Sequence, residues 1–325
     1  MKTLFKFLAL GLSALVLAVG YGLSATALSL HVSTITALIA GGLGIVFVIL
    51  VFTSKRPVIA ITVGFLPVIA ALFWWSGVAP RNDRNWAPEL AQTVQTDFEG
   101  SQATLHNVRD FTWISETEFE ERWVSRTFDL DTLDSVDVAL SYWGIDKIAH
   151  VLVSFGFADG EQIVFSVEIR KELGEAFSEL GGLFKQFELS LIAATEQDIL
   201  YLRTNARDPR EDVYLYPLKV DAKARRDLFM SYARLGNQLA KEPRWYNTIT
   251  ANCSTAVYRL VRSFSPGRKF DPRFVLSGGL PEYFAEHDML AWDAPLGDFR
   301  ARAAISTKAQ QIQPGQSYSE IIRAE

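Results

Sequence analysis

The sequence predicts an extracytoplasmic α+β domain that follows a bundle of membrane-spanning helices. Long apolar runs fill residues 1–80, which contain no Asp or Glu, whereas the rest of the chain has mixed charge. In that second part, alternating apolar positions predict strands and apolar positions at helical spacing predict helices. A mixture of this kind indicates the α+β class.

Composition and charge exclude several classes of protein. The 325-residue chain has a net charge of -5 and no basic block, so it lacks the positive patch typical of nucleic-acid binding. Its single cysteine excludes an intrachain disulfide and every multi-cysteine metal motif. Four scattered histidines give no ligand spacing, so we expect neither a metal site nor a cofactor.

Three apolar segments are long enough to cross a bilayer. Residues 7–30, 35–52 and 58–78 each approach the ~20 residues that a transmembrane helix needs. The first run could instead be a cleaved signal peptide, because Ala25-Thr26-Ala27 resembles an A-x-A cleavage site. That run is long for a signal peptide, so a membrane anchor of three helices over 1–80 is the leading interpretation.

The placement of Lys and Arg predicts the orientation of these helices. Lys2, Lys6, Lys55 and Arg56 flank the spans on one side, while the loop over 29–34 has no Lys or Arg. The positive-inside rule puts these four residues in the cytoplasm. The outer face of the membrane then carries a domain over 81–300 and a polar tail over 301–325, which we expect to be poorly ordered after Lys308.

Short elements make up the outer domain. We expect helices over 87–97, 196–202 and 222–242, and a short helix that starts at 280. We expect strands over 104–113, 133–140, 148–157, 162–170 and 214–218. The alternation in 104–113 is typical of an edge or barrel strand.

The clearest element is a β-hairpin over residues 148–170, whose turn contains an Asp-Gly pair. Its odd positions are apolar, and its even positions include His150, Ser166, Glu168 and Arg170. A three-residue loop would pair even with even positions and set His150 opposite Glu168 at ~5 Å, whereas a two-residue loop would mix the faces. The even face is therefore expected to be polar. It gathers His150, Ser166 and Glu168 for a function, or it is simply a solvated face.

Cys253 lies at the predicted start of a helix. Val257, Leu260 and Val261 follow it at helical spacing, and its immediate neighbours are capping and turn residues. The positive end of a helix dipole favours thiolate over thiol, and the thiolate is the nucleophile. The alternative is a small buried cysteine without chemistry.

Cysteine hydrolases and acyltransferases combine a thiolate, a histidine that exchanges its proton, and a polar group that orients the histidine. This chain offers Cys253, His150 and either Glu168 or Ser166. The histidine precedes the cysteine, an order that resembles circularly permuted papain-like domains. It is similar to NlpC-type enzymes and lecithin:retinol acyltransferase, where an Asn-Cys dipeptide likewise opens the nucleophile helix.

Several further blocks resemble one bacterial family. They cover residues 107–111, 148–150, 154–157, 166–172, 214–216 and 246–254. In this order they are similar to the Lnb N-terminal periplasmic domain family, over roughly 83–263. Because Lnb itself is a lipoprotein N-acyltransferase, the resemblance implies thiol-mediated acyl transfer at the outer face of the bacterial cytoplasmic (inner) membrane. In Lnb the domain precedes the membrane-spanning part, whereas here the spans come first, so we carry over the chemistry rather than the substrate.

By position, the resemblance makes Cys253 the nucleophile and His150 its base, with Glu168 or Ser166 orienting the imidazole. The same blocks contain five candidate supporting residues, namely Arg109, Arg170, Tyr246, Asn247 and Asn252. We expect Arg109 to form an ion pair, for example with Glu168. Asn252 is either a helix cap or an oxyanion donor.

Three functions follow from this sequence. The leading one is a membrane-anchored acyltransferase whose donor is a phospholipid and whose acceptor is the amino group of a lipoprotein. The second is a cell-wall amidase or peptidase that uses the same cysteine and histidine. The third is a non-catalytic membrane protein that uses the fold for binding or assembly.

Overall fold

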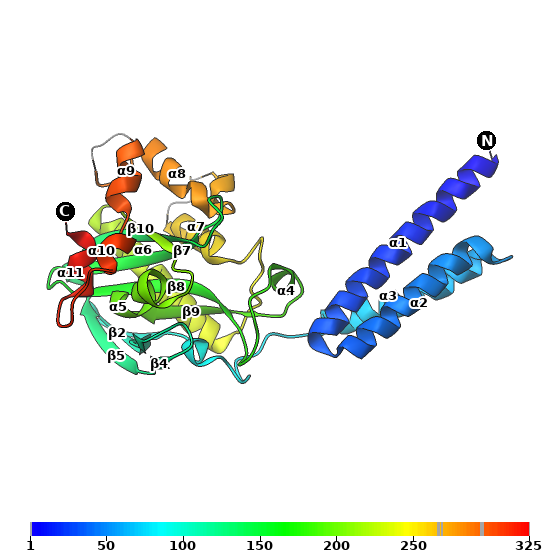
Figure 1. Cartoon of the computed structure of the whole chain (residues 1–325), viewed down its shortest axis with the longest axis horizontal. Helices are drawn as coiled ribbons and strands as arrows, with labels where there is room; N and C mark the ends of the chain where they lie inside the picture. The colour runs from blue at the N-terminus through cyan, green and yellow to red at the C-terminus, as the bar shows by residue number, and fades with distance from the viewer. Residues whose placement is uncertain (1, 265–266, 268, 293–295, 325) are drawn as a thin grey trace. The chain divides into compact units, whose positions relative to one another are not determined.

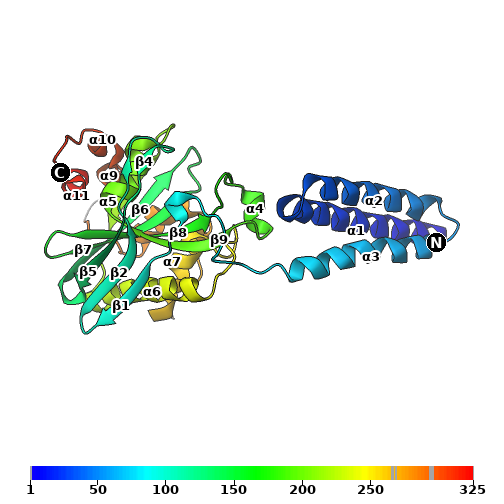
Figure 2. The ribbon, with the colours of Figure 1, turned by 90° about the horizontal axis from the view of Figure 1, so that it is seen from below.

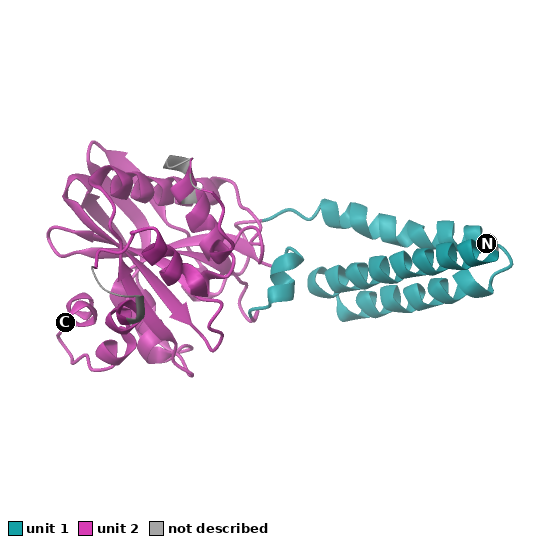
Figure 3. Cartoon of the chain, turned by 90° about the horizontal axis from the view of Figure 1, so that it is seen from above, with its two compact units in different colours: residues 1–80, 177–186 teal, residues 81–176, 187–325 magenta. Residues whose placement is uncertain are grey.

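The computed structural model describes residues 2–264, 267, 269–292 and 296–324. The chain forms two compact units, which are residues 1–80 with 177–186 and residues 81–176 with 187–325. Figures 1 and 2 show the elements of both units, and Figure 3 colours each unit separately. The first unit thus contains a segment, 177–186, that the sequence does not predict to belong with the apolar helices.

The first unit contains the three predicted apolar helices, α1 (Lys2–His31), α2 (Thr34–Thr53) and α3 (Pro57–Ser76). All three are long and apolar enough to cross a membrane. The helices approach closely at glycines, since a Cβ added to Gly44 would lie 2.7 Å from the Cβ of Tyr21. The Tyr21 hydroxyl donates to the carbonyl of Gly64 at 3.0 Å. Small residues and interhelical hydrogen bonds of this kind hold helices together in lipid.

The surface of this bundle is as apolar as its interior. Most of its Leu, Ile, Val and Phe side chains are exposed, including Phe5, Ile35 and Phe73. In water such a surface would be strongly unfavourable, whereas in lipid it costs nothing. Helix α1 also runs without a break through Ala25-Thr26-Ala27.

The second unit is built on an eight-stranded sheet in the order β1-β2-β9-β8-β7-β6-β10, with β5 paired to β2. All pairs are antiparallel except β2 with β9. The strands are β1 (Gln95–Glu99), β2 (Gln102–Arg109), β5 (Trp123–Asp129), β6 (Leu133–Tyr142), β7 (His150–Phe157), β8 (Gln162–Arg170), β9 (Glu188–Ala194) and β10 (Asp212–Pro217). A separate two-stranded sheet pairs β3 (Thr112–Trp113) with β4 (Phe119–Glu120).

Helices cover both faces of the large sheet. Their bounds are α5 (Glu196–Tyr201), the π-helical turn η3 (Leu202–Ala206), α6 (Ala222–Lys241), α7 (Cys253–Phe264), α8 (Leu280–Glu286), α9 (Leu296–Ala303), α10 (Ser306–Ala309) and α11 (Tyr318–Arg323). Short 3-10 turns are η1 (Pro88–Leu90), η2 (Leu130–Thr132), η4 (Pro272–Phe274) and η5 (Ser277–Gly279).

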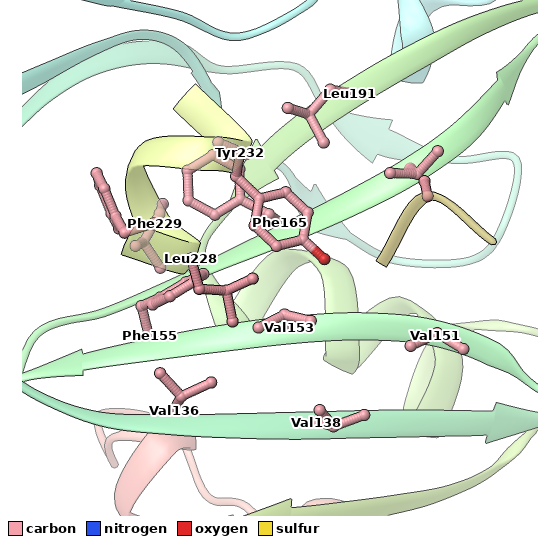
Figure 4. Close-up of a cluster of buried hydrophobic side chains, with 14 of the residues drawn as sticks. Val136, Val138, Val151, Val153, Phe155, Phe165, Leu191, Leu228, Phe229 and Tyr232 are labelled. Atoms are coloured by element: carbon pink, nitrogen blue, oxygen red, sulfur yellow. The ribbon is translucent and has the colours of Figure 1, made fainter. Parts of the chain in front are cut away.

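The larger core lies between α6 and the sheet. Leu228, Phe229 and Tyr232 of α6 pack against Phe155 and Phe165, which are odd-numbered residues of β7 and β8 (Figure 4). Burial of such aromatic side chains contributes about 1.5–3 kcal/mol each. This core fixes the two strands that carry His150 and Glu168.

The hairpin has the predicted register. Leu152 pairs with Ser166 and Gly156 with Gln162, so even positions oppose even positions across a three-residue loop. Its even face is not solvated, however. Leu152 and Val164 lie in a second core together with residues of α5, α10 and α11, and the buried Ser154 donates to Glu196 at 2.7 Å. Tertiary packing thus converts the predicted polar face into a buried one.

Three other expectations are wrong. Residues 87–97 form only the short turn η1 before β1 begins, and β2 has partners on both sides instead of lying at an edge. The tail is not poorly ordered, since Tyr318 and Ile322 of α11 are buried and Arg323 forms an ion pair with Glu196 at 2.7 Å. Polar residues made this segment look solvated in the sequence, but Tyr318 and Ile322 pack in the core on the sheet.

Candidate active site

The loop before α7 is shaped by two asparagine amides. The side-chain oxygen of Asn247 accepts from the backbone N–H groups of Ile249 and Thr250 at 3.1 and 2.9 Å. Asn252 accepts from the backbone N–H of Thr255 at 2.9 Å, which makes it the cap of α7. Its amide nitrogen donates to the carbonyl of Thr248 at 2.8 Å. Asn252 is therefore the helix cap that was one of its two expected roles, and the role of oxyanion donor stays a prediction.

Cys253 is the first residue of α7, as the sequence predicts, and its side chain is partly buried. The His150 side chain and the backbone N–H of Val151 lie close enough to the thiol to lower its pKa. His150 is the first residue of β7, and it lies directly before Val151. The start of a helix and the start of a strand thus bring together two residues that are far apart in the sequence.

The other side of the imidazole contacts β8. His150 Nε2 lies 2.7 Å from Ser166 Oγ and 3.1 Å from Glu168 Oε1. The Ser166 hydroxyl donates to Glu168 Oε1 at 2.7 Å, so its oxygen is left to accept. Because the carboxylate can only accept as well, Nε2 must carry the proton. Nδ1 is then the ring nitrogen that can take the thiol proton.

Arg203 completes this cluster, although the sequence analysis did not single it out. It lies on the π-helical turn η3 and is buried, and its guanidinium donates to Glu168 Oε1 at 3.2 Å. The same group lies 3.9 Å from Glu211. No local pattern around Arg203 resembles a site, so only its position in the fold reveals the contact.

Ser277 is a second residue that sequence reasoning missed. Its buried hydroxyl accepts from the backbone N–H of Ala149 at 3.0 Å and donates to the carbonyl of Ala149 at 2.6 Å. Ala149 directly precedes His150 in the chain. Ser277 therefore fixes the backbone at the position from which the imidazole projects.

Electrostatics favour a charged pair of cysteine and histidine. Burial acts to lower the pKa of His150, but the negative charges of Glu168 and Cys253 raise it to about 9. Burial acts to raise the pKa of Cys253, but the positive charge of His150 brings it below its usual value. Burial likewise opposes ionisation of Glu168, yet His150, Arg203 and Ser166 hold its pKa well below its usual range. At neutral pH the imidazolium and the carboxylate are therefore favoured, and the lowered pKa of Cys253 raises the share of its thiolate form.

Two of the predicted supporting arginines serve the fold. The guanidinium of Arg109 forms a buried ion pair with Asp198 at 2.8 Å, so the suggested pairing with Glu168 is wrong. Arg170 donates to the backbone carbonyls of Leu90 and Ala91 and lies over the ring of Trp86. Both residues are held by interactions of the scaffold.

Tyr246 is partly buried against the larger core, and its backbone N–H donates to Phe187 at 3.0 Å. It positions the loop that precedes α7. Among the residues that the structure describes, no group of three or more His, Cys, Asp or Glu side chains could hold a metal ion.

The comparison with known proteins identifies the family. The family model of the Lnb N-terminal periplasmic domain matches residues 119–281, which is half of the chain and includes His150, Ser166, Glu168 and Cys253. The chain belongs to this family. Together with the three apolar helices, the Lnb domain makes this a membrane protein with a periplasmic domain. Neither the curated proteins nor the solved structures contain a match.

Proposed function

We propose that this protein is a thiol acyltransferase that forms an acyl-cysteine intermediate on Cys253. The observation that carries the proposal is the continuous chain of contacts from Cys253 through His150 to Ser166 and Glu168. A nucleophile, a base and a group that orients the base are the three parts that such chemistry needs. Their positions around one imidazole also support the proposal of a circularly permuted papain-like domain.

The reaction would take place in two steps. The Cys253 thiolate attacks the carbonyl carbon of an acyl ester, a C–S bond forms, and the C–O bond to the alcohol breaks. His150 gives its Nδ1 proton to the departing alkoxide. An amine then attacks the thioester and passes a proton to His150, and the thiolate leaves. Both steps use the same pair, and Glu168 stabilises the imidazolium that is present before the first step and forms again in the second.

The membrane anchor supports a lipid as the acyl donor. A domain tethered to a bilayer meets phospholipid esters at high local concentration. We propose a phospholipid donor and, by analogy with Lnb, the amino group of a lipoprotein as acceptor.

The test of this proposal is the intact mass of the protein after incubation with phospholipid vesicles. We expect the mass to increase by one acyl group, and hydroxylamine to remove that group because it is a thioester. The Cys253→Ser variant is the matched control and should gain no hydroxylamine-sensitive mass. A wild-type protein that gains no acyl group from any phospholipid would contradict the donor, and cleavage of cell-wall peptides by the same protein would favour an amidase.

The proposed location is the bacterial inner membrane, with three spans and the Lnb domain on the outer face. The Lys and Arg distribution supports this topology. We expect Gln316→Cys, in the exposed loop between α10 and α11, to react with a membrane-impermeant maleimide in intact spheroplasts. Both the variant and its control are made in a Cys253→Ser background, which has no other cysteine.

Ser54→Cys is the control for this topology. Ser54 directly precedes Lys55 and Arg56, so it should react only after lysis. The reverse pattern, with Ser54→Cys labelled in intact spheroplasts and Gln316→Cys only after lysis, would show that the orientation is inverted.

A further inference from the structure

The segment 177–186 joins β8 to β9 in the chain, yet it belongs to the same compact unit as the apolar helices (Figure 3). It contains the short helix α4 (Glu179–Leu183), which is capped by the hydroxyl of Ser178. A connection between two strands of one unit that belongs to the other unit must be held there by specific contacts.

Polar contacts attach this segment to one end of the helical bundle. His31 Nε2, at the end of α1, lies 2.7 Å from the carbonyl of Phe184. The ammonium of Lys185 donates to the carbonyl of Trp75 at 3.0 Å and lies 4.3 Å from the centre of the Trp75 ring. Since α1 and α3 both end here, the segment lies at the depth where these helices leave the apolar layer.

The residues at these contacts are typical of a membrane boundary. Trp and Lys side chains concentrate at the level of the lipid headgroups, where an apolar ring and a charged end are both accommodated. The ring of His31 lies 6.2 Å from that of Trp74, which places a second indole at the same end. The 177–186 segment is therefore attached to the interfacial part of the bundle.

Three large apolar side chains of the segment remain uncovered. Phe177, Leu180 and Leu183 are exposed, while the glycines between the two leucines are buried. Single exposed apolar residues are ordinary, but three within seven residues at the end of a membrane anchor form a compact apolar patch. An interfacial element buries such side chains among the headgroups and the upper acyl chains.

We infer that residues 177–186 form a membrane-contact element that inserts Phe177, Leu180 and Leu183 into the lipid interface. The partner is the surface of the outer leaflet. This inference rests on the membrane placement in the proposed function, and it adds a lipid contact contributed by the periplasmic part of the chain.

The experiment uses spin labels on the full chain in vesicles of phosphatidylethanolamine and phosphatidylglycerol. Single cysteines are introduced in the Cys253→Ser background at Leu180 and, as a second position, at Phe177. For each label, collisions with oxygen, which concentrates in lipid, are compared with collisions with a water-soluble nickel chelate. Two matched controls are exposed apolar residues, Leu66 in the middle of α3 (58% exposed) and Ile114 in the second unit (70% exposed).

We expect the oxygen-to-nickel ratio at Leu180 and Phe177 to be several-fold higher than at Ile114 and to approach that at Leu66. A ratio equal to that at Ile114, with Leu66 in lipid, would overturn the inference while the membrane anchor of the proposed function stands. Low access of both reagents to the Leu180 label would also overturn it, because a second protein surface would then cover the patch. An aqueous Leu66 label would instead contradict the anchor itself.

Discussion

Replacing Cys253 by serine is expected to abolish acyl transfer while leaving the fold intact. The hydroxyl is nearly isosteric with the thiol, but its pKa is far too high for His150 to ionise it. Turnover should fall by roughly 10⁴-fold or more, since no other residue can form the covalent intermediate. The measurement is release of the alcohol product from a phospholipid substrate, together with thermal unfolding of the solubilised protein as a check on folding.

The His150→Ala variant should lose activity to a similar extent, and the double variant should be little worse than either single one. Cys253 and His150 are expected to act as a unit, because the charge of each group favours the ionised form of the other. Additive losses in the double variant would mean that the two residues act independently. Full activity of Cys253→Ser would overturn covalent catalysis by Cys253, whereas a wild-type protein without turnover would favour a binding or assembly protein.

Replacing Glu168 by glutamine is expected to lower turnover by between about 10² and 10⁴-fold without unfolding the domain. The amide oxygen can still accept from Ser166 and from His150 Nε2, so the geometry is retained. What disappears is the negative charge that, with the charge of Cys253, raises the pKa of His150 to about 9. We therefore expect the charge of Glu168 to contribute more to turnover than its hydrogen bond with His150.

The pH profile separates this role from a merely structural one. Release of the alcohol needs protonated His150, so activity is retained below the pKa of His150 and is lost as the pH rises through it. In Glu168→Gln that pKa falls, so the loss of activity should move to lower pH. Ser166→Ala is the matched control, because it removes a neutral partner and should leave this loss near pH 9. Unchanged turnover in Glu168→Gln beside an inactive Ser166→Ala would transfer the orienting role to Ser166.

Local patterns were sufficient for several features of this protein. Runs of apolar residues predicted all three long helices, because burial in lipid requires nothing more than length and composition. Alternation predicted the hairpin and its even-to-even register, because a one-residue slip would reverse the faces of a strand. The cap residues around Cys253 placed it at a helix start, since capping is a short-range interaction.

Features that depend on distant contacts were not visible in the sequence. The even face of the hairpin has a polar sequence pattern, yet α5, α10 and α11 bury it. Two of these helices, α10 and α11, belong to the tail, whose composition predicts disorder. Arg109 pairs with Asp198 rather than Glu168, and Arg203 contacts Glu168 instead. Ion pairs depend on which elements pack together, and no residue spacing encodes that choice.

The sequence by itself determined the membrane anchor, the hairpin that carries His150, Ser166 and Glu168, and the helix that begins at Cys253. Each of these follows from interactions within about twenty residues. Only the tertiary structure decided that the imidazole lies between the thiol and the carboxylate, that Arg203 and Ser277 support it, and that residues 177–186 join the anchor. Such contacts form when distant segments pack, because the burial that stabilises them is a property of the whole core.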